Sequence, residues 1–242
     1  MESIISNINQ INKRIEATCL KVGRNPREVK LLLATKTVPV EKIKIALLHG
    51  QTIIAENKVQ EVKEKYEGLK NIPHINHFIG HLQTNKIKEL IKYDVSCIHS
   101  LDRLELAEKL QHRLALEDKR MEVFLQVNTS YEESKFGIDP QEVSTLIHQI
   151  ANFDRLEIKG LMTIGLFSAE KEKVRKCFRL LKEIQQKIKA ENIPNVAIDE
   201  LSMGMSNDLE TAIEEGATII RVGTAIFGTR KYSNNYYWNE HK

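Results

Sequence analysis

Several features that would assign a chain to a specialised class are missing from this sequence of 242 residues. No apolar stretch approaches the roughly 18–20 residues of a membrane helix, and the start of the chain lacks the basic and apolar regions of a secretory signal. Lysine plus arginine (36) nearly balances aspartate plus glutamate (33), so the net charge is only +3. We therefore expect a globular, cytoplasmic protein that binds neither a membrane nor nucleic acid.

Cysteine is also scarce. Cys19, Cys97 and Cys177 are odd in number and far apart, so they make no disulfide framework, and their spacing is not that of metal ligands. We interpret them as small buried hydrophobic side chains in a reducing cytosol.

The apolar residues that are present alternate between strand-like and helix-like patterns. Strict alternation favours a parallel sheet, and eight such units over about 200 residues have the size of a minimal (β/α)₈ TIM barrel. An open, doubly wound sheet is the alternative, but no glycine-rich dinucleotide fingerprint follows a strand. The predicted strands are 29–36, 52–56, 77–80, 95–100, 121–128, 156–164, 197–203 and 218–222, and the predicted helices are 40–49, 57–69, 83–92, 101–117, 140–150, 169–190 and 207–216.

The domain organisation is predicted to be simple. A helix over 3–22 precedes the first strand and would cover the barrel, and no low-complexity linker divides the chain. We predict a single barrel domain over 1–230 and a polar, aromatic tail over 231–242. Asp102 is predicted to cap the helix that follows it.

Polar residues follow most of the predicted strands. In a (β/α)₈ barrel, the C-terminal ends of the strands form the face that carries the active site. Residues from different strands therefore converge on one mouth. The candidates are Thr35, Lys36, Glu56, Asn57, Gly80, His81, His99, Ser100, Asn128, Thr129, Met162, Thr163, Ser202, Met203, Arg221, Gly223 and Thr224.

Lys36 is the most informative of these candidates. It ends an apolar strand, so its side chain is expected to face the top of the barrel. Desolvation at such a position disfavours a charged amine, which suits a lysine that forms a Schiff base. The alternative is a lysine that reaches the rim or pairs with a carboxylate such as Glu56.

The segments after the last two predicted strands have the features of a phosphate site. The segment SMGMS (202–206) opens a helix, and RVGT (221–224) follows the final strand. Barrels often bind phosphate between these two loops, on backbone N–H groups at a helix N-terminus. Ser206 would supply a hydroxyl and Gly223 a close backbone approach. The alternative is that Ser206 is only a helix cap and Gly223 only a turn residue.

The spacing does not favour a metal centre or a hydrolase triad. His74, His77 and His81 lie close in sequence, but Gly80 interrupts a common ligand face, and no carboxylate or cysteine completes the set. We predict no metal site. The serines of the 202–206 segment lie outside any G-x-S-x-G elbow, so a nucleophilic serine is not predicted.

Eight segments between residues 31 and 228 match the motifs of a known family. They are LLLATKTVP (31–39), ENKVQE (56–61), HFIGHLQTNKIK (77–88), IHSLDRLELAEKL (98–110), QVNTSYEESKFG (126–137), KGLMTIG (159–165), LSMGMSNDLETAIEEGAT (201–218) and RVGTAIFG (221–228). On these segments the chain resembles the pyridoxal 5′-phosphate (PLP) homeostasis proteins. The third and seventh segments are long and specific signatures of that family.

The resemblance implies a single barrel like the N-terminal domain of alanine racemase, the type III fold of PLP proteins. It implies that PLP is bound as a Schiff base on Lys36. Arg221 would face the ring or its nitrogen, and Asn57 would lie near the ring substituents. No catalytic residue is implied.

The resemblance also implies where the phosphate of PLP is held. Ser206, Gly223 and Thr224 would bind it, and Met203 and Met205 would line the site. These loops are also the ones that the barrel pattern indicates for phosphate.

The chain departs from the family motifs at four positions. Ala55 replaces a glycine and Lys58 replaces an aromatic residue beside Asn57, which puts the fit of that loop over the ring in doubt. Tyr131 and Asn207 stand where glycine or another small residue is common. None of these changes removes a residue that would hold PLP.

The implied chemistry favours a binding protein over an enzyme. An arginine at the ring nitrogen leaves PLP a weak electron sink, and racemisation needs a base on each face of the ring, of which Lys36 supplies one. In racemase relatives the second base comes from a second domain and a partner subunit, for which this chain has no room. We expect a protein that buffers or delivers PLP without robust catalysis. A minimal amino-acid racemase is one alternative, and a phosphate-binding isomerase without PLP is another.

The expected partners follow from this role. They are PLP itself and, at the level of the family, PLP-dependent apo-enzymes or PLP-synthesising enzymes. A small barrel of modest charge is expected to be a monomer.

Overall fold

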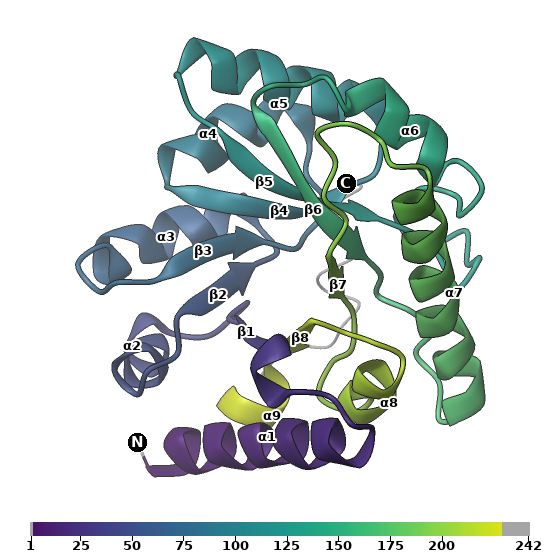
Figure 1. The fold of residues 1–242 in the computed structure, drawn as a ribbon. Helices are drawn as coiled ribbons and strands as arrows, with labels where there is room; N and C mark the ends of the chain where they lie inside the picture. The colour runs from purple at the N-terminus through teal and green to yellow at the C-terminus, as the bar shows by residue number, and fades with distance from the viewer. Residues whose placement is uncertain (1, 229–242) are drawn as a thin grey trace.

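The centre of the molecule is a closed barrel of parallel strands, seen in a computed structural model that describes residues 2–228 (Figure 1). The strands follow one another around the barrel in the order of the sequence, and β8 pairs with β1 to close the ring. They are β1 Lys30–Ala34, β2 Ile53–Glu56, β3 Ile75–Phe78, β4 Val95–Leu101, β5 Met121–Gln126, β6 Leu156–Met162, β7 Glu200–Ser202 and β8 Ile219–Val222. The predicted (β/α)₈ barrel is confirmed, and the open sheet is wrong.

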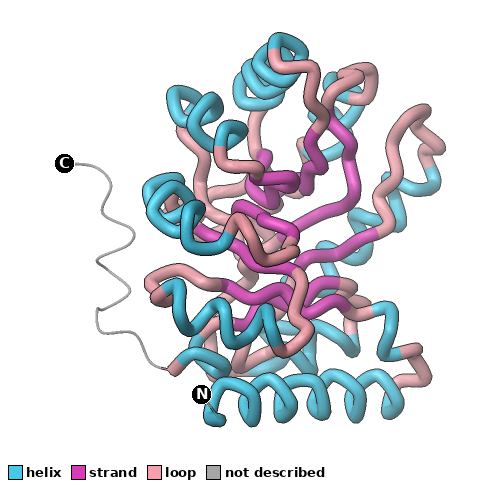
Figure 2. Tube along the Cα trace, turned by 90° about the vertical axis from the view of Figure 1, so that its left-hand side faces the viewer, coloured by secondary structure: helices cyan, strands magenta, loops and turns pink. Residues whose placement is uncertain are grey.

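Helices surround this barrel, as Figure 2 shows from the side. Their apolar faces pack on the strands; α7, for example, buries Val174, Phe178 and Leu181 at helical spacing. The helices are α1 Glu2–Lys21, α2 Val40–Leu48, α3 Val59–Leu69, α4 Ile87–Lys92, α5 Leu104–Leu116, α6 Val143–Ile150, α7 Lys171–Ala190, α8 Leu209–Glu214 and α9 Thr224–Phe227, with 3₁₀ turns η1 Pro26–Glu28 and η2 Thr84–Lys86.

The N-terminal helix α1 covers the side of the barrel where the last helices are short. Its buried residues Ile4, Ile8, Ile11 and Ile15 recur every three or four positions and form one apolar stripe. This stripe packs against α2, α8 and α9, and Figure 1 shows α1 running beneath α8 and α9. The segment predicted as a helix over 3–22 is α1, which contacts α2, α8 and α9.

The interior of the barrel differs from the layer outside it. Six strands contribute a small apolar cluster to the interior: Leu32, Ala55, Cys97, Phe124, Met162 and Ile219. A much larger apolar core joins the strands to the helices. The protein also buries polar side chains, among them His77, His99, Ser202 and Arg221. Buried polar groups of this kind need hydrogen-bond partners.

Two details near the helix ends differ from the prediction. Asp102 does not cap α5, because Arg103 takes the cap position and its guanidinium binds the Asp102 carboxylate at 2.6 Å. The short helix α9 begins at Thr224, where no helix was predicted. The predicted boundary at residue 230 and the tail 231–242 lie outside the described residues.

The remaining expectations from composition concern cysteines and membrane spans. Cys19, Cys97 and Cys177 are all free and buried, as predicted. Within residues 2–228, no helix is long and apolar enough to cross a bilayer.

Candidate functional site

The predicted site residues cluster on four neighbouring strands. Lys36 follows β1, Asn57 follows β2, Ser206 follows β7, and Gly223 follows β8. Pairing of β7 with β8, β8 with β1 and β1 with β2 places these strand ends side by side. Because all strands are parallel, the loops open on the same face of the barrel.

Lys36 is half-buried on a tight turn after β1. The residues on either side of it, Thr35 and Thr37, donate hydrogen bonds to carboxylates. The Thr35 hydroxyl donates to Glu56 at 2.6 Å, and the Thr37 N–H donates to Glu61 at 2.6 Å. Thr37 has a φ of 64°, a left-handed conformation that costs a non-glycine residue on the order of 1 kcal/mol. The hydrogen bond from Thr37 to Glu61 therefore stabilises an unfavourable turn directly beside Lys36.

Glu56, Glu61 and Lys65 form an ion cluster, which we call the carboxylate clamp. The Lys65 ammonium donates to both carboxylates at 2.7 Å and to the Thr35 carbonyl oxygen at 2.9 Å, so its three N–H groups are all used. The Glu56 side chain is only 2% exposed, and its burial raises its pKa to about 7. Burial acts on Glu61 too, but bonds from Lys65 and Thr37 outweigh it and lower the Glu61 pKa.

Asn57 is fixed by the close approach of the loop after β3. A Cβ atom at Gly80 would lie 2.0 Å from the Asn57 carbonyl oxygen, so only glycine fits there. The Asn57 side-chain oxygen is buried and has no hydrogen-bond partner among residues 2–228, which leaves it available to a donor on a bound group. The two unusual neighbours, Ala55 and Lys58, are buried and half-buried and leave Asn57 at the strand end.

The loops after β7 and β8 meet at the mouth of the barrel. The hydroxyl oxygens of Ser206 and Thr224 lie 3.4 Å apart, and Thr224 begins α9. A Cβ atom at Gly223 would lie 2.7 Å from the Ala34 carbonyl oxygen, so glycine permits the close contact between the β8 and β1 ends. The structure thus brings together the three residues predicted to hold a phosphate.

Met203 is the one predicted site residue that is not brought to this face. It is fully buried in the large core that joins strands and helices, together with Leu201 and Leu209. Side chains alternate along a strand, and the neighbouring Ser202 is the one that contacts Arg221 inside the barrel. Packing gives no support to a cofactor contact from Met203.

Arg221 is a buried cation held by neutral acceptors. Its guanidinium donates to the Ser202 carbonyl oxygen at 2.6 Å, the Ser202 hydroxyl at 2.8 Å and the Thr163 carbonyl oxygen at 2.8 Å. Burial lowers its pKa to about 10, against the weaker attraction of Asp208. No carboxylate of residues 2–228 makes a salt bridge to Arg221, so the site suits an electron-rich group.

His74, His77 and His81 lie close in sequence but have separate partners in the structure. His74 bonds the Ile72 carbonyl oxygen at 2.7 Å, and His81 stacks on Phe136 at a centroid distance of 3.9 Å. His77 instead lies inside the barrel, 2.9 Å from a nitrogen of His99.

Cys97 completes a group with this histidine pair that sequence spacing did not reveal. The possible ligand atoms of His77, Cys97 and His99 all lie within 4.8 Å of one another. Their proximity follows from strand pairing, since His77 lies opposite Cys97 and His99 is two residues further along β4.

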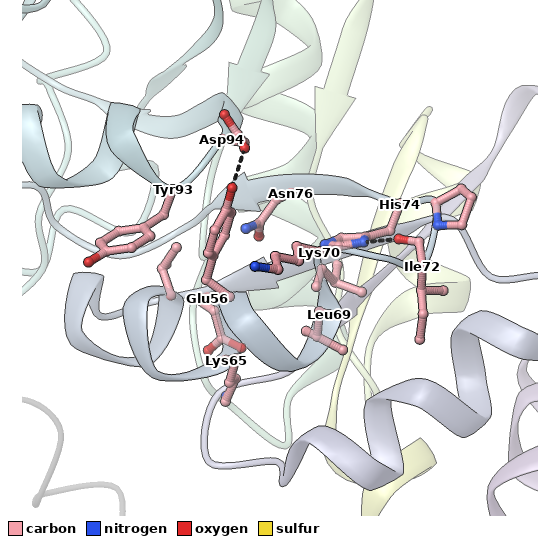
Figure 3. Close-up of a pocket in the computed structure, with 13 residues that line it drawn as sticks. Glu56, Lys65, Leu69, Lys70, Ile72, His74, Asn76, Tyr93 and Asp94 are labelled. Carbon is pink, nitrogen blue, oxygen red and sulfur yellow. Dashed lines mark hydrogen bonds and ion pairs between the residues drawn. The ribbon is translucent and has the colours of Figure 1, made fainter.

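A separate cavity of about 230 Å³ lies away from the strand-end face (Figure 3). It lies between α3 and the outer side of β2 and β3, where Tyr66, Lys70 and Asn76 are among its lining residues. Glu56 and Lys65 also line it, so the carboxylate clamp separates this cavity from the Lys36 turn. The residues predicted from sequence lie on the other side of the clamp, and we place the functional site there.

The barrel and the lysine, hydroxyl and arginine groups at its mouth define a protein of the alanine racemase barrel class. In agreement, residues 4–231 match the family model described as alanine racemase, N-terminal domain.

Relatives narrow the class to one family. The pyridoxal phosphate homeostasis protein of Aquifex aeolicus is 43% identical over 93% of this chain and 97% of its own length. A protein from Bifidobacterium adolescentis, whose crystal structure is described as that of an unknown protein, superposes with a TM-score of 0.89 at 38% identity, over 93% of this chain and 95% of its own. PipY of Synechococcus elongatus, solved with PLP bound, superposes with a TM-score of 0.79 at 31% identity, over 90% of this chain and 100% of its own. The chain belongs to the pyridoxal phosphate homeostasis protein family, as predicted.

Proposed function

We propose that this chain binds PLP at the mouth of the barrel and holds it covalently on Lys36. The observation that carries the proposal is that Lys36, the Ser206 and Thr224 hydroxyls and Arg221 belong to neighbouring strand ends. When bound, PLP supplies an aldehyde that a lysine amine can capture and a ring that withdraws electrons.

The phosphate and ring positions follow from the groups available. The two hydroxyls and the backbone N–H groups at the start of α9 would bind the phosphate, as barrels commonly do at this position. The unpartnered oxygen of Asn57 would accept a hydrogen bond at the ring side. Arg221, which has no bonded carboxylate among the described residues, would face the ring nitrogen.

Arg221 also favours storage over catalysis. A guanidinium offers only hydrogen-bond donors, so a ring nitrogen opposite it stays unprotonated and the ring is a weak electron sink. The chain would then serve as a reserve that shields PLP and buffers or delivers it. The role named for its relatives supports this proposal.

The proposed partners are PLP-dependent apo-enzymes that receive PLP and enzymes that synthesise it. We place the chain in the cytoplasm and propose that it works as a monomer. A minimal amino-acid racemase remains the second candidate, because the matching family model is that of an alanine racemase domain.

The test loads the purified chain with PLP and follows uptake, transfer and turnover. We expect one PLP per chain, recovery of activity when an apo-enzyme is added, and no exchange of the α-proton of alanine beyond that with free PLP. A chain that takes up no PLP would sink the proposal. Exchange at ordinary enzyme rates, about 1 s⁻¹ or faster, would favour the racemase.

A further inference from the structure

A line of hydrogen bonds runs through the barrel interior from Arg221 to His77. Arg221 donates to the Ser202 hydroxyl at 2.8 Å, that hydroxyl lies 2.9 Å from His99 Nδ1, and His99 Nε2 lies 2.9 Å from His77 Nδ1. Ser202 and His99 are fully buried and His77 nearly so. The line joins β8, β7, β4 and β3 across the barrel.

The direction of each hydrogen bond in this line can be worked out. Arg221 can only donate, so the Ser202 oxygen accepts from it and the Ser202 hydroxyl hydrogen points to His99 Nδ1. A neutral His99 with an unprotonated Nδ1 carries its hydrogen on Nε2 and donates it to His77 Nδ1. Any reversal would leave a buried hydrogen without an acceptor or set two donors against each other.

Charge agrees with this assignment. Burial lowers the pKa of His99 well below its usual value and that of His77 to about 4, so both rings are neutral at pH 7. Neutral rings add no positive charge beside the buried guanidinium of Arg221. The neutral rings also do not compete with a bound group for the N–H groups of Arg221.

The guanidinium keeps part of its donor capacity. Its bonds to Ser202 and to the Thr163 carbonyl oxygen use three N–H groups within the described structure. A guanidinium has five N–H groups, so two are left for a bound molecule. Their direction depends on the acceptors that orient the plane, and one of those acceptors is the Ser202 hydroxyl.

We propose that Ser202, His99 and His77 are positioning residues for Arg221. They hold the Ser202 hydroxyl as an acceptor and orient the guanidinium, so that one of its two remaining N–H groups can donate to the ring nitrogen of PLP. This inference rests on the proposed function, because it assumes that PLP occupies the mouth above Arg221.

A metal centre at His77, Cys97 and His99 is the competing account. The close nitrogens of the two histidines already bond each other, and burial raises the pKa of the Cys97 thiol well above its usual value. The hydrogen-bonded line explains the same residues without an ion.

The test compares two substitutions at one position. His99→Phe keeps the ring that stacks on Phe124 at 4.3 Å but removes both nitrogens. His99→Asn is smaller but keeps an oxygen that can accept from Ser202. The measurements are the rate of PLP release to a scavenging apo-enzyme and the pH midpoint of the absorbance of the PLP-loaded chain.

If hydrogen bonding positions Arg221, His99→Phe and Ser202→Ala release PLP about tenfold faster and move the pH midpoint. Ser202→Ala removes a hydrogen bond to the charged guanidinium, and His99→Phe removes the acceptor that orients the Ser202 hydroxyl. His99→Asn stays within about twofold of the unchanged chain, since the acceptor remains. The control is Cys97→Ala, in the same interior but outside the line, and it should change neither quantity. Circular dichroism confirms folding, and Ser202→Ala, which removes one atom, decides the case if His99→Phe does not fold.

If His99→Phe releases PLP at nearly the rate of the unchanged chain and His99→Asn releases it rapidly, then packing and not hydrogen bonding matters at His99. Equal behaviour of all variants would also overturn the inference. Failure of the unchanged chain to take up PLP is a different result, which removes the proposed function instead. Zinc that copurifies in a one-to-one ratio and is lost in Cys97→Ala would favour the metal centre.

Discussion

The two sides of the candidate site are held by different kinds of interaction. The Lys36 side depends on the carboxylate clamp, in which Lys65 joins two carboxylates within 2.7 Å. The Arg221 side depends on neutral hydroxyl, imidazole and carbonyl acceptors. The residue proposed to bond PLP covalently is thus supported by charges, whereas the residue proposed to face the ring is supported by neutral hydrogen bonds.

The difference gives the two sides opposite responses to pH. Glu56 has a pKa of about 7 in the fold against 4.5 in a model compound, so its stabilising contribution is full below pH 4.5 and is lost as pH rises through 7. His77 has a pKa of about 4 against 6.5, so its contribution is present above pH 6.5 and is lost as pH falls through 4. Between about pH 4.5 and 6.5, the Lys36 side therefore weakens with rising pH while the Arg221 side strengthens.

The largest expected effect is that of Lys36→Ala. The variant should form no covalent link after borohydride treatment, because the proposed amine is gone. It should still bind some PLP through Ser206, Thr224 and Arg221, measured by equilibrium dialysis. Complete loss of PLP binding would mean that the Arg221 side does not hold PLP without the link to Lys36.

The next effect tests the clamp. Lys65→Met leaves the buried Glu56 and Glu61 carboxylates without their shared ammonium, and we expect it to lower the free energy of unfolding by about 3 kcal/mol. The measurement is urea unfolding. A matched control next to the same helix is Lys70→Met, which breaks an exposed pair with Glu67 and should change stability far less. Equal losses of stability in Lys65→Met and Lys70→Met would show that burial of the ion pairs does not set their contribution.

A smaller effect isolates the pH response of Glu56. Glu56→Gln removes a group whose raised pKa lowers the stability of the fold between pH 4.5 and 7, so the unfolding free energy should fall less steeply there. One proton limits the change in slope to about 1.4 kcal/mol per pH unit. Urea unfolding at several pH values measures it. An unchanged slope in the variant would remove Glu56 as its source.

The smallest effect concerns charge without burial. Lys30 and Glu200 form an ion pair at 2.7 Å, but the Lys30 side chain is half exposed. Lys30→Met should change the unfolding free energy by less than about 1 kcal/mol and leave PLP binding unchanged. If Lys30→Met lowered the unfolding free energy as much as Lys65→Met does, the carboxylate clamp would stabilise the fold no more than a surface ion pair.

Most of the fold and part of the site could be predicted from the sequence. Apolar periodicity identified each strand and each long helix, because burial imposes it along every segment. It missed α9, since four residues hold too little of a helical period, and it misassigned Asp102, whose carboxylate binds Arg103 instead of a backbone N–H.

The supporting network of the site was harder to predict. The pair Glu61 and Lys65 is visible as an i, i+4 spacing, but its connection to Glu56 and to the Lys36 turn depends on how α3 packs on the strands. The line through Ser202 and His99 joins residues 103 positions apart, and only strand register brings them together. Side chains alternate between the two faces of a strand. This alternation along β7 could have separated the inward Ser202 from the outward Met203.

The most direct test of the account is the intact mass of the PLP-loaded chain before and after borohydride reduction, followed by peptide mapping. We expect one stable pyridoxyl group per chain after reduction, on the peptide that contains Lys36. Modification of Lys65 or another lysine in its place, or no stable modification at all, would contradict it.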